Sequence, residues 1–531
     1  MSAPAWRARI AACAAAVASA LGIALFARVR WPWVWLCWVA LVPWLGVLAR
    51  ATSARAALAA GVLMCEAFAL VVFSWFPSAI QNYTALAWPL ALLLVVLVAP
   101  LLEPQFIAFA LAHHLARRHR AHWWHPALVG ACIYVGTEWA LPKLFADTLG
   151  QALYASVLMR QAADLAGAHG LTFILLIGNA CVLAALRLAV APRRAVTPVA
   201  MLAALILGLC AYGALRVSQF EGDKVHDAAP VSAVLVQANI SKYGQLAAEM
   251  GTFDATRMIL DTHFGLSTDA LRRAPADLLV WPETVYPTTF GSPKSDDGAA
   301  FDREIAAFVA RMGIPLVFGA YDAEAGDEFN AAMFLQPTAD GKLAFESYRK
   351  RWLFPLIERA PALLDSPSVR RWLPWLGTWK SGTGSQVISL TLRNGRTLRV
   401  APLICYDAID SGLALSAVRQ GADLLVTLSN DSWFDYGDVP RLILVLSAFR
   451  SIETRRPQIR ATNTGVSAVI TASGELVHTV GMDRRETVVA AVTPESRATT
   501  LMLAWGDWFG PTALAVGIGL LAVSRFGRSV G

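Results

Sequence analysis

The sequence has 531 residues, of which 56% are hydrophobic and 16% charged, whereas soluble proteins have about 45–50% and about 25%. Together with a mean hydropathy of +0.50, this composition excludes a disordered chain, a disulfide scaffold and an ordinary cytosolic enzyme. The net charge of +7 does not indicate nucleic-acid binding, because the arginines cluster at the ends of apolar runs, as they do in membrane proteins.

Eight apolar runs are long enough to cross a bilayer, which takes about 20 residues. They fall near residues 9–27, 31–49, 56–77, 85–111, 125–142, 165–190, 196–216 and 501–523. The first run follows two arginines, as in a signal peptide, but it lacks a small-residue cleavage site, so we expect it to be retained. We therefore expect a seven-span domain at 1–218, a globular domain at 228–495 and an eighth transmembrane helix at 500–524.

The short loops predict the orientation of these spans. With the N-terminus inside, the inner loops and the C-terminal tail hold Arg50, Arg55, Arg117, Arg118, Arg120, Arg187, Arg193, Arg194, Arg525 and Arg528, whereas Arg28 and Arg30 fall on the outer side and do not fit this orientation. The positive-inside rule then places the large globular domain outside the cytoplasm.

The globular domain alternates short β-rich runs with helical patterns, which predicts an α/β fold with buried sheets. Strands are expected at Val231–Gln237, Asp277–Trp281, Leu316–Ala320, Val387–Thr391, Leu398–Ile404, Asp423–Leu428 and Val466–Thr471. Helices are expected near 245–264, 298–312 and 438–455. Ligands of α/β sheets bind where strands end, so the residues that follow these strands are the candidates for function.

One thiol stands apart from the others. Six of the seven cysteines lie in predicted spans, where cysteine is most often a small core residue: Cys13, Cys37, Cys65, Cys132, Cys181 and Cys210. The globular domain holds only Cys405, which excludes a disulfide within it. This thiol is either buried and inert or used in chemistry.

Three strand ends carry reactive groups. Glu283 follows an apolar strand that breaks at Pro282, Lys350 precedes the apolar segment 352–355, and Cys405 ends the strand at Leu398–Ile404. Taken singly, each has an ordinary interpretation as a solvated turn residue, a surface lysine or a core cysteine. Taken together, they supply a base, an oxyanion-stabilising cation and a nucleophile for acyl transfer.

The choice of base follows from the residues available. Histidine is the common partner of a thiol, but His226, His263 and His478 are the domain's histidines and none follows one of these strands. A glutamate in an apolar site can serve instead, because desolvation raises its pKa toward the working pH.

These motifs resemble the Glu-Lys-Cys triad of the nitrilase superfamily. The matching text is Val280-Trp281-Pro282-Glu283, Tyr348-Arg349-Lys350, Ile404-Cys405-Tyr406, the runs 236–240 and 430–434, and Arg460-Ala461-Thr462-Asn463-Thr464-Gly465-Val466-Ser467. With spans before and after the globular domain, the whole chain is similar to the apolipoprotein N-acyltransferase family.

The resemblance implies a four-layer αββα domain on eight transmembrane helices in the bacterial inner membrane, with its site on the periplasmic side. It implies a ping-pong reaction in which Cys405, deprotonated by Glu283, takes the sn-1 acyl chain of a phospholipid, usually phosphatidylethanolamine. The acceptor is the α-amino group of the diacylglyceryl-cysteine of an apolipoprotein, and Lys350 stabilises both tetrahedral intermediates. Membrane lipid is an expected partner; nucleic acid, a cofactor and a metal are not.

The resemblance also implies supporting residues. Glu358 matches a second glutamate of the family, and the matching motifs contain the supporting or substrate-binding candidates Tyr406, Trp433 and Asn239. The segment 352–380 is rich in tryptophan and leucine, with Arg370 and Arg371 among them, which is typical of the lipid interface. We expect a mobile arm that gates the entry of acyl chains; the alternative is a small core under a long loop.

Several positions depart from the family pattern. They are Asp407 for a glutamate, Arg441-Leu442 for a Gln-His pair, Leu356-Ile357 for Phe-Gly, Tyr243 for a tryptophan, and Phe145-Ala146-Asp147 for Phe-Pro-Trp. They leave the triad intact and bear on acceptor and lipid preference. One alternative function is a membrane-bound nitrilase-like amidase, or an N-acyltransferase with another amine acceptor. A second is a catalytically silent paralogue that binds lipid or lipoprotein.

Overall fold

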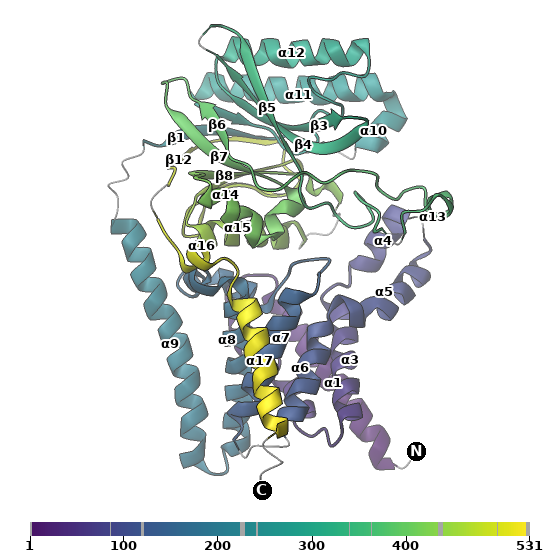
Figure 1. Ribbon diagram of the computed structural model, residues 1–531, viewed down its shortest axis with the longest axis vertical. Coiled ribbons are helices and arrows are strands. Elements are labelled where there is room, and N and C mark those ends of the chain that lie inside the picture. The colour runs from purple at the N-terminus through teal and green to yellow at the C-terminus, as the bar shows by residue number, and fades with distance from the viewer. Residues whose placement is uncertain are drawn as a thin grey trace. The chain divides into compact units, whose positions relative to one another are not determined.

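The computed structural model describes residues 3–84, 86–117, 122–222, 229–240, 243–338, 340–362, 364–433, 439–495 and 498–526 (Figure 1). The chain forms two compact units. The helical unit is Met1–Gln219 with Asp507–Gly531, and the sandwich unit is Phe220–Gly506. The residues of the sequence analysis that lie outside the described ranges include Arg118, Arg120, His226, Leu363, Phe434 and Arg528.

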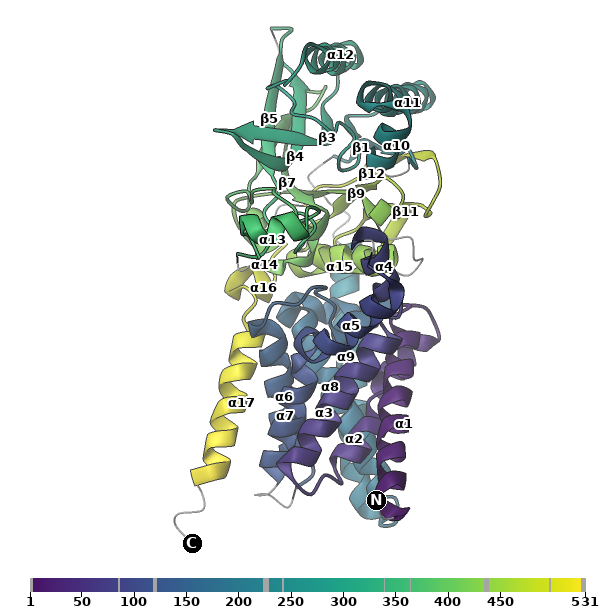
Figure 2. The same ribbon diagram turned by 90° about the vertical axis from the view of Figure 1, so that its right-hand side faces the viewer.

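Every predicted apolar run falls on helices (Figure 2). The α-helices of the helical unit are α1 (Ala3–Phe26), α2 (Val42–Leu48), α3 (Ala54–Val71), α4 (Phe76–Thr84), α5 (Trp88–Leu102), α6 (Pro104–Arg117), α7 (Trp124–Ala140), α8 (Ala163–Leu188), α9 (Pro192–Gly222) and α17 (Phe509–Phe526). Its 3-10 helices are η1 (Trp33–Trp38), η2 (Leu149–Ala155) and η3 (Met159–Ala162).

Not every run is long enough as a single helix to cross a membrane. By length and composition, four described helical stretches are, at Trp6–Phe26, Ala54–Val71, Met159–Leu188 and Pro192–Gln219. If α5 and α6, which are bent by 47° relative to each other, form one broken span, the number of such stretches rises to five. Trp33–Leu48 and Phe509–Ser524 are apolar helices that are shorter than this length. The count of eight spans therefore stays a prediction.

Two predicted runs are interrupted for identifiable reasons. The run at 85–111 breaks before Pro104, because proline lacks the N–H that a helix interior needs and begins α6 instead. The run at 501–523 divides at Gly506, whose φ of +78° ends α16 (Leu501–Trp505). Residues up to Gly506 belong to the sandwich unit, so the helix of the helical unit begins only at Phe509.

The sandwich unit contains two six-stranded sheets. The first has the order β12-β1-β2-β3-β4-β5, with β1 (Val231–Gln237), β2 (Leu278–Val280), β3 (Leu316–Glu324), β4 (Asp327–Pro337), β5 (Leu343–Arg349) and β12 (Glu486–Val492). The second has the order β11-β10-β9-β8-β7-β6, with β6 (Ile388–Thr391), β7 (Thr397–Ile404), β8 (Leu424–Ser429), β9 (Gln458–Thr462), β10 (Ser467–Ile470) and β11 (Leu476–Val480).

Helices cover the outer face of each sheet. The first sheet packs against α11 (Thr252–Arg273) and α12 (Asp296–Met312), with α10 (Tyr243–Met250) beside them; α14 (Ser411–Arg419) and α15 (Val439–Thr454) cover the second (Figure 1). A short helix, α13 (Pro367–Trp372), lies in the segment between β5 and β6. The result is the four-layer αββα arrangement that the resemblance implied.

Alternating side chains along each strand build two cores. In β1, Ala233 and Leu235 face the other sheet and pack with Val400 and Val426, whereas Val234 and Val236 face α11 and α12. Burial on both faces explains why these strands are nearly continuous apolar runs. The seven predicted strands are confirmed to within a few residues, while β4, β5, β9, β11 and β12 were not predicted.

Candidate active site

The three candidate catalytic residues follow three different strands. Glu283 comes after β2 and Lys350 directly after β5, both in the first sheet, whereas Cys405 directly follows β7 in the second sheet. The inter-sheet core joins the two sheets through residues of β2 and β7. The first sheet thus supplies the carboxylate and the ammonium, and the second supplies the thiol.

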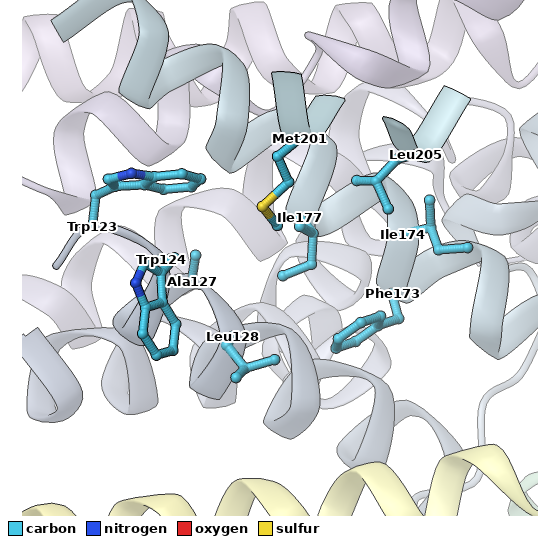
Figure 3. A pocket seen from close by; sticks show the side chains of 9 residues that line it. All are labelled: Trp123, Trp124, Ala127, Leu128, Phe173, Ile174, Ile177, Met201 and Leu205. Carbon is cyan, nitrogen blue, oxygen red and sulfur yellow. The ribbon is translucent and has the colours of Figure 1, made fainter. Parts of the chain in front are cut away.

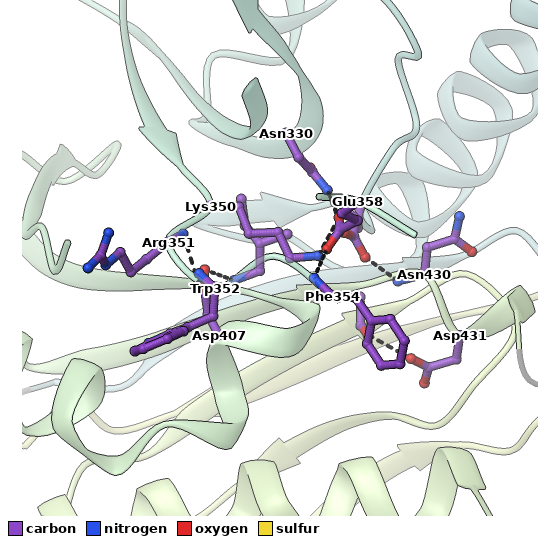
Figure 4. Close-up of polar contacts among 12 residues, drawn as sticks. Asn330, Lys350, Arg351, Trp352, Phe354, Glu358, Asp407, Asn430 and Asp431 are labelled. Atoms are coloured by element: carbon purple, nitrogen blue, oxygen red, sulfur yellow. Dashed lines mark hydrogen bonds and ion pairs between the residues drawn. The ribbon is translucent and has the colours of Figure 1, made fainter. Parts of the chain in front are cut away.

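A buried ammonium links two carboxylates (Figure 4). Lys350 Nζ donates to Glu283 Oε1 at 3.1 Å and to Glu358 Oε1 at 2.8 Å, and the side chains of Lys350 and Glu283 are 2% and 5% exposed. Burial alone would lower the pKa of Lys350, but Glu283, Glu358 and Cys405 reverse this effect and raise that pKa well above its usual value. The lysine therefore remains a cation throughout the working pH range.

The carboxylate of Glu283 accepts two further hydrogen bonds. Its Oε1 also accepts from Asn330 Nδ2 at 2.8 Å, and its Oε2 accepts from the backbone N–H of Asn430 at 2.8 Å. Burial raises the pKa of Glu283, while the charge of Lys350 lowers it. A carboxylate with a raised pKa is a better proton acceptor, as general-base catalysis requires.

Asn330 is a site residue that the sequence analysis did not identify. It lies on β4, is 5% exposed, and its Nδ2 donates both to Glu283 Oε1 and to Glu358 Oε1, the latter at 3.1 Å. Its backbone carbonyl also accepts from the N–H of Lys350 at 2.8 Å. A single amide within an otherwise apolar strand, Phe329–Leu335, was the available signal.

Cys405 opens the 3-10 helix η4 (Cys405–Ile409) with a φ of +46°, a left-handed conformation that a cysteine rarely adopts. Thr284, next to Glu283, has a φ of +58°. Such residues cost about 1–3 kcal/mol each and cluster at active sites. Burial and the charge of Glu283 raise the pKa of the Cys405 thiol, with Lys350 opposing, so the resting thiol is protonated and needs a base.

Asp407 holds the turn after the nucleophile. Its carboxylate accepts from the backbone N–H of Ile404 at 3.0 Å, of Trp352 at 2.7 Å and of Arg351 at 3.1 Å, and from the hydroxyl of Tyr348 at 2.9 Å. Burial raises the pKa of Asp407 to about 7, although the hydrogen bonds oppose it. The shorter side chain at this position thus connects the Cys405 turn to the residues after Lys350.

A buried ion pair supports Asn430. Asp431, the next residue, accepts from Ser429 Oγ at 2.6 Å and from Arg460 Nη2 at 3.0 Å, and the Arg460 and Asp431 side chains are both 0% exposed. Gly465 is required beside them, because a Cβ there would lie 1.9 Å from Asp431 Oδ2. The pair fixes the backbone whose N–H reaches Glu283.

The supporting residues proposed from the sequence are placed unevenly. Glu358 belongs to the charge cluster, and its Oε2 accepts from the N–H of Phe354 at 2.7 Å. Tyr406 packs edge-to-face on Phe354, with ring centroids 5.1 Å apart. Asn239 donates hydrogen bonds to the backbone carbonyls of Asp483 and Asn463, which are not residues of the triad. Trp433 ends the turn η5 (Asp431–Trp433), but its side chain lies outside the described residues.

The other departures from the family pattern lie in different places. Tyr243 begins α10 and packs on the helix-side core of the first sheet, and Arg441 lies in α15. Asp147 belongs to the helical unit, where its carboxylate is 3.4 Å from Lys143 Nζ.

The segment 352–380 combines anchored and exposed parts. Its N–H groups at Gly377 and Trp379 donate to the carbonyls of Leu356 and Glu358, and Leu376 is buried. Trp372 on α13 is 87% exposed and Trp352 is 43% exposed. Leu363 lies outside the described residues. The segment therefore contains a small buried part and an exposed aromatic part; its mobility stays a prediction.

Comparison with known proteins gives two family matches. Residues 232–500 match the carbon-nitrogen hydrolase family, and residues 18–181 match the apolipoprotein N-acyltransferase N-terminal domain.

Within the described residues, no group of three or more histidines, cysteines or carboxylates is arranged to hold a metal ion.

Curated relatives cover both units. The chain is 26% identical over 90% of its length to an apolipoprotein N-acyltransferase of Bdellovibrio bacteriovorus, of which it covers 87%. The chain is also 28% identical to an apolipoprotein N-acyltransferase of Geobacter metallireducens. This match covers 83% of the chain and 82% of the relative. A relative of the same name in Chlorobaculum tepidum is 28% identical over 69% of this chain and 71% of its own.

Proposed function

The chain belongs to the carbon-nitrogen hydrolase family, and on that basis we propose that it transfers an acyl chain from a phospholipid to the α-amino group of an apolipoprotein. The observation that carries the chemistry is the ammonium of Lys350 held between Glu283 and Glu358 beside the strained Cys405. The match of residues 18–181 to the apolipoprotein N-acyltransferase N-terminal domain supports acyl transfer at a membrane over hydrolysis of a soluble amide.

In the first half-reaction, Glu283 accepts the proton of the Cys405 thiol, and the sulfur attacks the carbonyl carbon of the sn-1 ester. The carbonyl oxygen becomes an oxyanion, which the Lys350 ammonium stabilises; one such donor is commonly worth about 3–4 kcal/mol. The intermediate then breaks its carbon–oxygen bond. The lysophospholipid leaves with the proton from Glu283, and the acyl chain remains on the sulfur as a thioester.

In the second half-reaction, the amine of a diacylglyceryl-cysteine attacks the thioester carbon, and Glu283 accepts a proton from the amine. The second oxyanion faces the same ammonium, the carbon–sulfur bond breaks, and the thiolate takes back the proton. The product is an amide and the free Cys405 thiol. Because Glu283 is bonded to Asn330 and Asn430 in the resting site, its carboxylate is oriented before either substrate binds.

We propose phosphatidylethanolamine as the donor and the bacterial inner membrane as the location, with the sandwich unit on the periplasmic side. The short basic loops support this orientation through the positive-inside rule. A periplasmic reporter fused after residue 230 should be active, and one fused at the C-terminal tail should not. The opposite pattern would contradict the orientation.

The function is tested by incubating the purified full-length protein with a phospholipid that carries a clickable sn-1 chain. The wild type should acquire the label as a hydroxylamine-sensitive thioester, and Cys405→Ser should not. Cys132→Ser, which removes a thiol of the helical unit, is the matched control and should label normally. Label on Cys405→Ser would contradict the assignment of the nucleophile.

The acceptor is tested separately by mass spectrometry of a lipoprotein N-terminus after addition to the labelled enzyme. Transfer gives an N-acylated, triacylated peptide. Release of free fatty acid alone would show hydrolysis and would contradict acyl transfer while leaving the thioester chemistry intact.

A further inference from the structure

An apolar cleft of about 310 Å³ lies between α7, α8 and α9 of the helical unit. Trp123 and Trp124 lie together at one end of it, and Phe173 and Leu205 lie at the other (Figure 3). Ile177 and Met201 face the space between them, and none of the described side chains that line the cleft is charged. All nine of the described lining residues belong to the helical unit.

The third wall of the cleft is a helix with little packing. In the most apolar part of α9, 11% of residues are buried, whereas the corresponding figures for the other long apolar stretches are 28%, 44% and 56%. α9 therefore presents most of its surface to the surrounding solvent, which for such an apolar helix is lipid. A cleft beside it is open to lipid hydrocarbon.

The lining and the volume select the kind of ligand. A polar ligand needs a few placed polar groups to bind, and the described residues of this lining have aliphatic, aromatic and thioether side chains. The volume is at the lower end of the range for small-molecule sites, about 300–1,000 Å³. It therefore suits a single hydrocarbon chain better than a whole lipid.

One basic residue continues the cleft-lining face of α9. Met201 and Leu205 are four residues apart, and Arg194 lies seven residues before Met201. Because α9 continues as a helix through Pro198, this spacing places all three near one side of it. At about 1.5 Å per residue, Arg194 is about 10 Å along the axis from Met201. Just before α7, His122 stacks on Trp124 at the tryptophan end, with ring centroids 6.1 Å apart.

Both helices begin at the end of the unit that the basic loops predict to be cytoplasmic. Tryptophan is typical of the membrane interface, and basic pockets between transmembrane helices on the cytoplasmic side bind anionic headgroups. An exposed arginine beyond the mouth of an apolar cleft favours a phospholipid over a second copy of α9, since that helix would bring the same positive charge.

We propose that this cleft binds one acyl chain of an anionic phospholipid, whose phosphate is held by Arg194. The site is separate from the proposed catalytic chemistry, because its residues belong to a different unit from Glu283, Lys350 and Cys405. The bound lipid fixes α9 against α7 and α8.

Native mass spectrometry of the full-length protein tests the proposal, with phosphatidylglycerol or phosphatidylcholine added at equal concentration. We expect one retained phosphatidylglycerol per chain and no comparable retention of phosphatidylcholine. Arg194→Gln should lower the retained fraction about fivefold, the effect of one basic residue near an anionic surface. Arg193→Gln, an exposed arginine on a neighbouring face of α9, is the matched control and should retain the lipid.

A second pair of variants tests the apolar part. Leu205→Trp fills the cleft and should abolish retention, whereas Leu207→Trp, at a position that is 67% exposed on another face of α9, should not. If Leu205→Trp does not fold, the comparison of Arg194→Gln with Arg193→Gln still tests the proposal, because neither arginine variant alters the packed core. Equal retention by Arg194→Gln and Arg193→Gln would overturn the proposal. A dimeric mass in place of a lipid adduct would also overturn it and assign the cleft to a second copy.

Discussion

Asn330→Leu removes a side-chain amide that donates to both carboxylates of the site, at 2.8 Å to Glu283 and 3.1 Å to Glu358. Leucine keeps nearly the same volume, and the main-chain bond from the N–H of Lys350 to residue 330 is retained. Each hydrogen bond to a charged group contributes about 1.5–3 kcal/mol. The variant should therefore lower the free energy of unfolding by about 3 kcal/mol.

The catalytic effect has a definite sign. The amide of Asn330 stabilises the ionised form of Glu283 and so lowers its pKa, against the larger effect of burial. Without the amide, that pKa rises further. Because acylation needs the ionised base, the acidic limb of the acylation rate should move to higher pH.

Single-turnover acylation, followed by the mass of the protein at a series of pH values, measures this shift. Gln336→Leu is the matched control, since its amide lies on the same strand and bonds only to neutral backbone groups of Ser389 and Thr391. It should cost about 1 kcal/mol and leave the acidic limb in place. An unmoved limb in Asn330→Leu, with the protein folded, would refute the reasoning about Glu283.

Three further predictions follow from the site. Glu283→Gln should abolish acylation, whereas Lys350→Met should slow both acylation and transfer by about 100- to 1000-fold. If the two variants only have lower melting temperatures, and their folded fraction acylates at the wild-type rate, both catalytic roles would be disproved. Because burial raises the pKa of Asp407 from 3.8 to about 7, its contribution to stability is present below pH 4 and lost as pH rises to 7, so the melting-temperature advantage of wild type over Asp407→Asn should shrink across that interval. Arg460→Met leaves Asp431 charged and buried, and should cost about 3–5 kcal/mol in unfolding experiments and slow acylation in the folded fraction; normal acylation there would show that the pair does not position Asn430.

The sequence was informative where function coincides with the end of an apolar strand. Glu283 and Cys405 each follow a run that is buried on both faces, and such runs are detectable without a structure. Asn330 was missed because its role depends on the pairing of β4 with β5, in which Ala331 lies opposite Arg349. The local sequence does not determine the register between neighbouring strands, so the hydrogen-bond partners of Asn330 could not be predicted.

The burial of charged residues was a second feature that the sequence did not show. Arg460 lies in the middle of β9 with no exposed surface, whereas an arginine in a sequence is expected at the surface. Asp431, which follows β8, forms a buried ion pair with it and so compensates part of the cost of burying its charge. The same reasoning applies to the helical unit, where hydropathy located the apolar runs but did not show the 47° bend between α5 and α6.

The division of the site between two sheets has a consequence for how the enzyme responds to heat and to mutation. Loop hydrogen bonds from Asn430 and to Asp407 connect the two halves of the site, but the separation between the Glu283 carboxylate and the Cys405 sulfur also depends on the layer of side chains between β2 and β7, which includes Val280 and Val400. Loosening of that layer moves proton acceptor and proton donor apart while every strand remains paired. Turnover should therefore decline on warming before secondary structure is lost. A larger side chain in place of either valine should reduce the rate markedly while changing the melting temperature little.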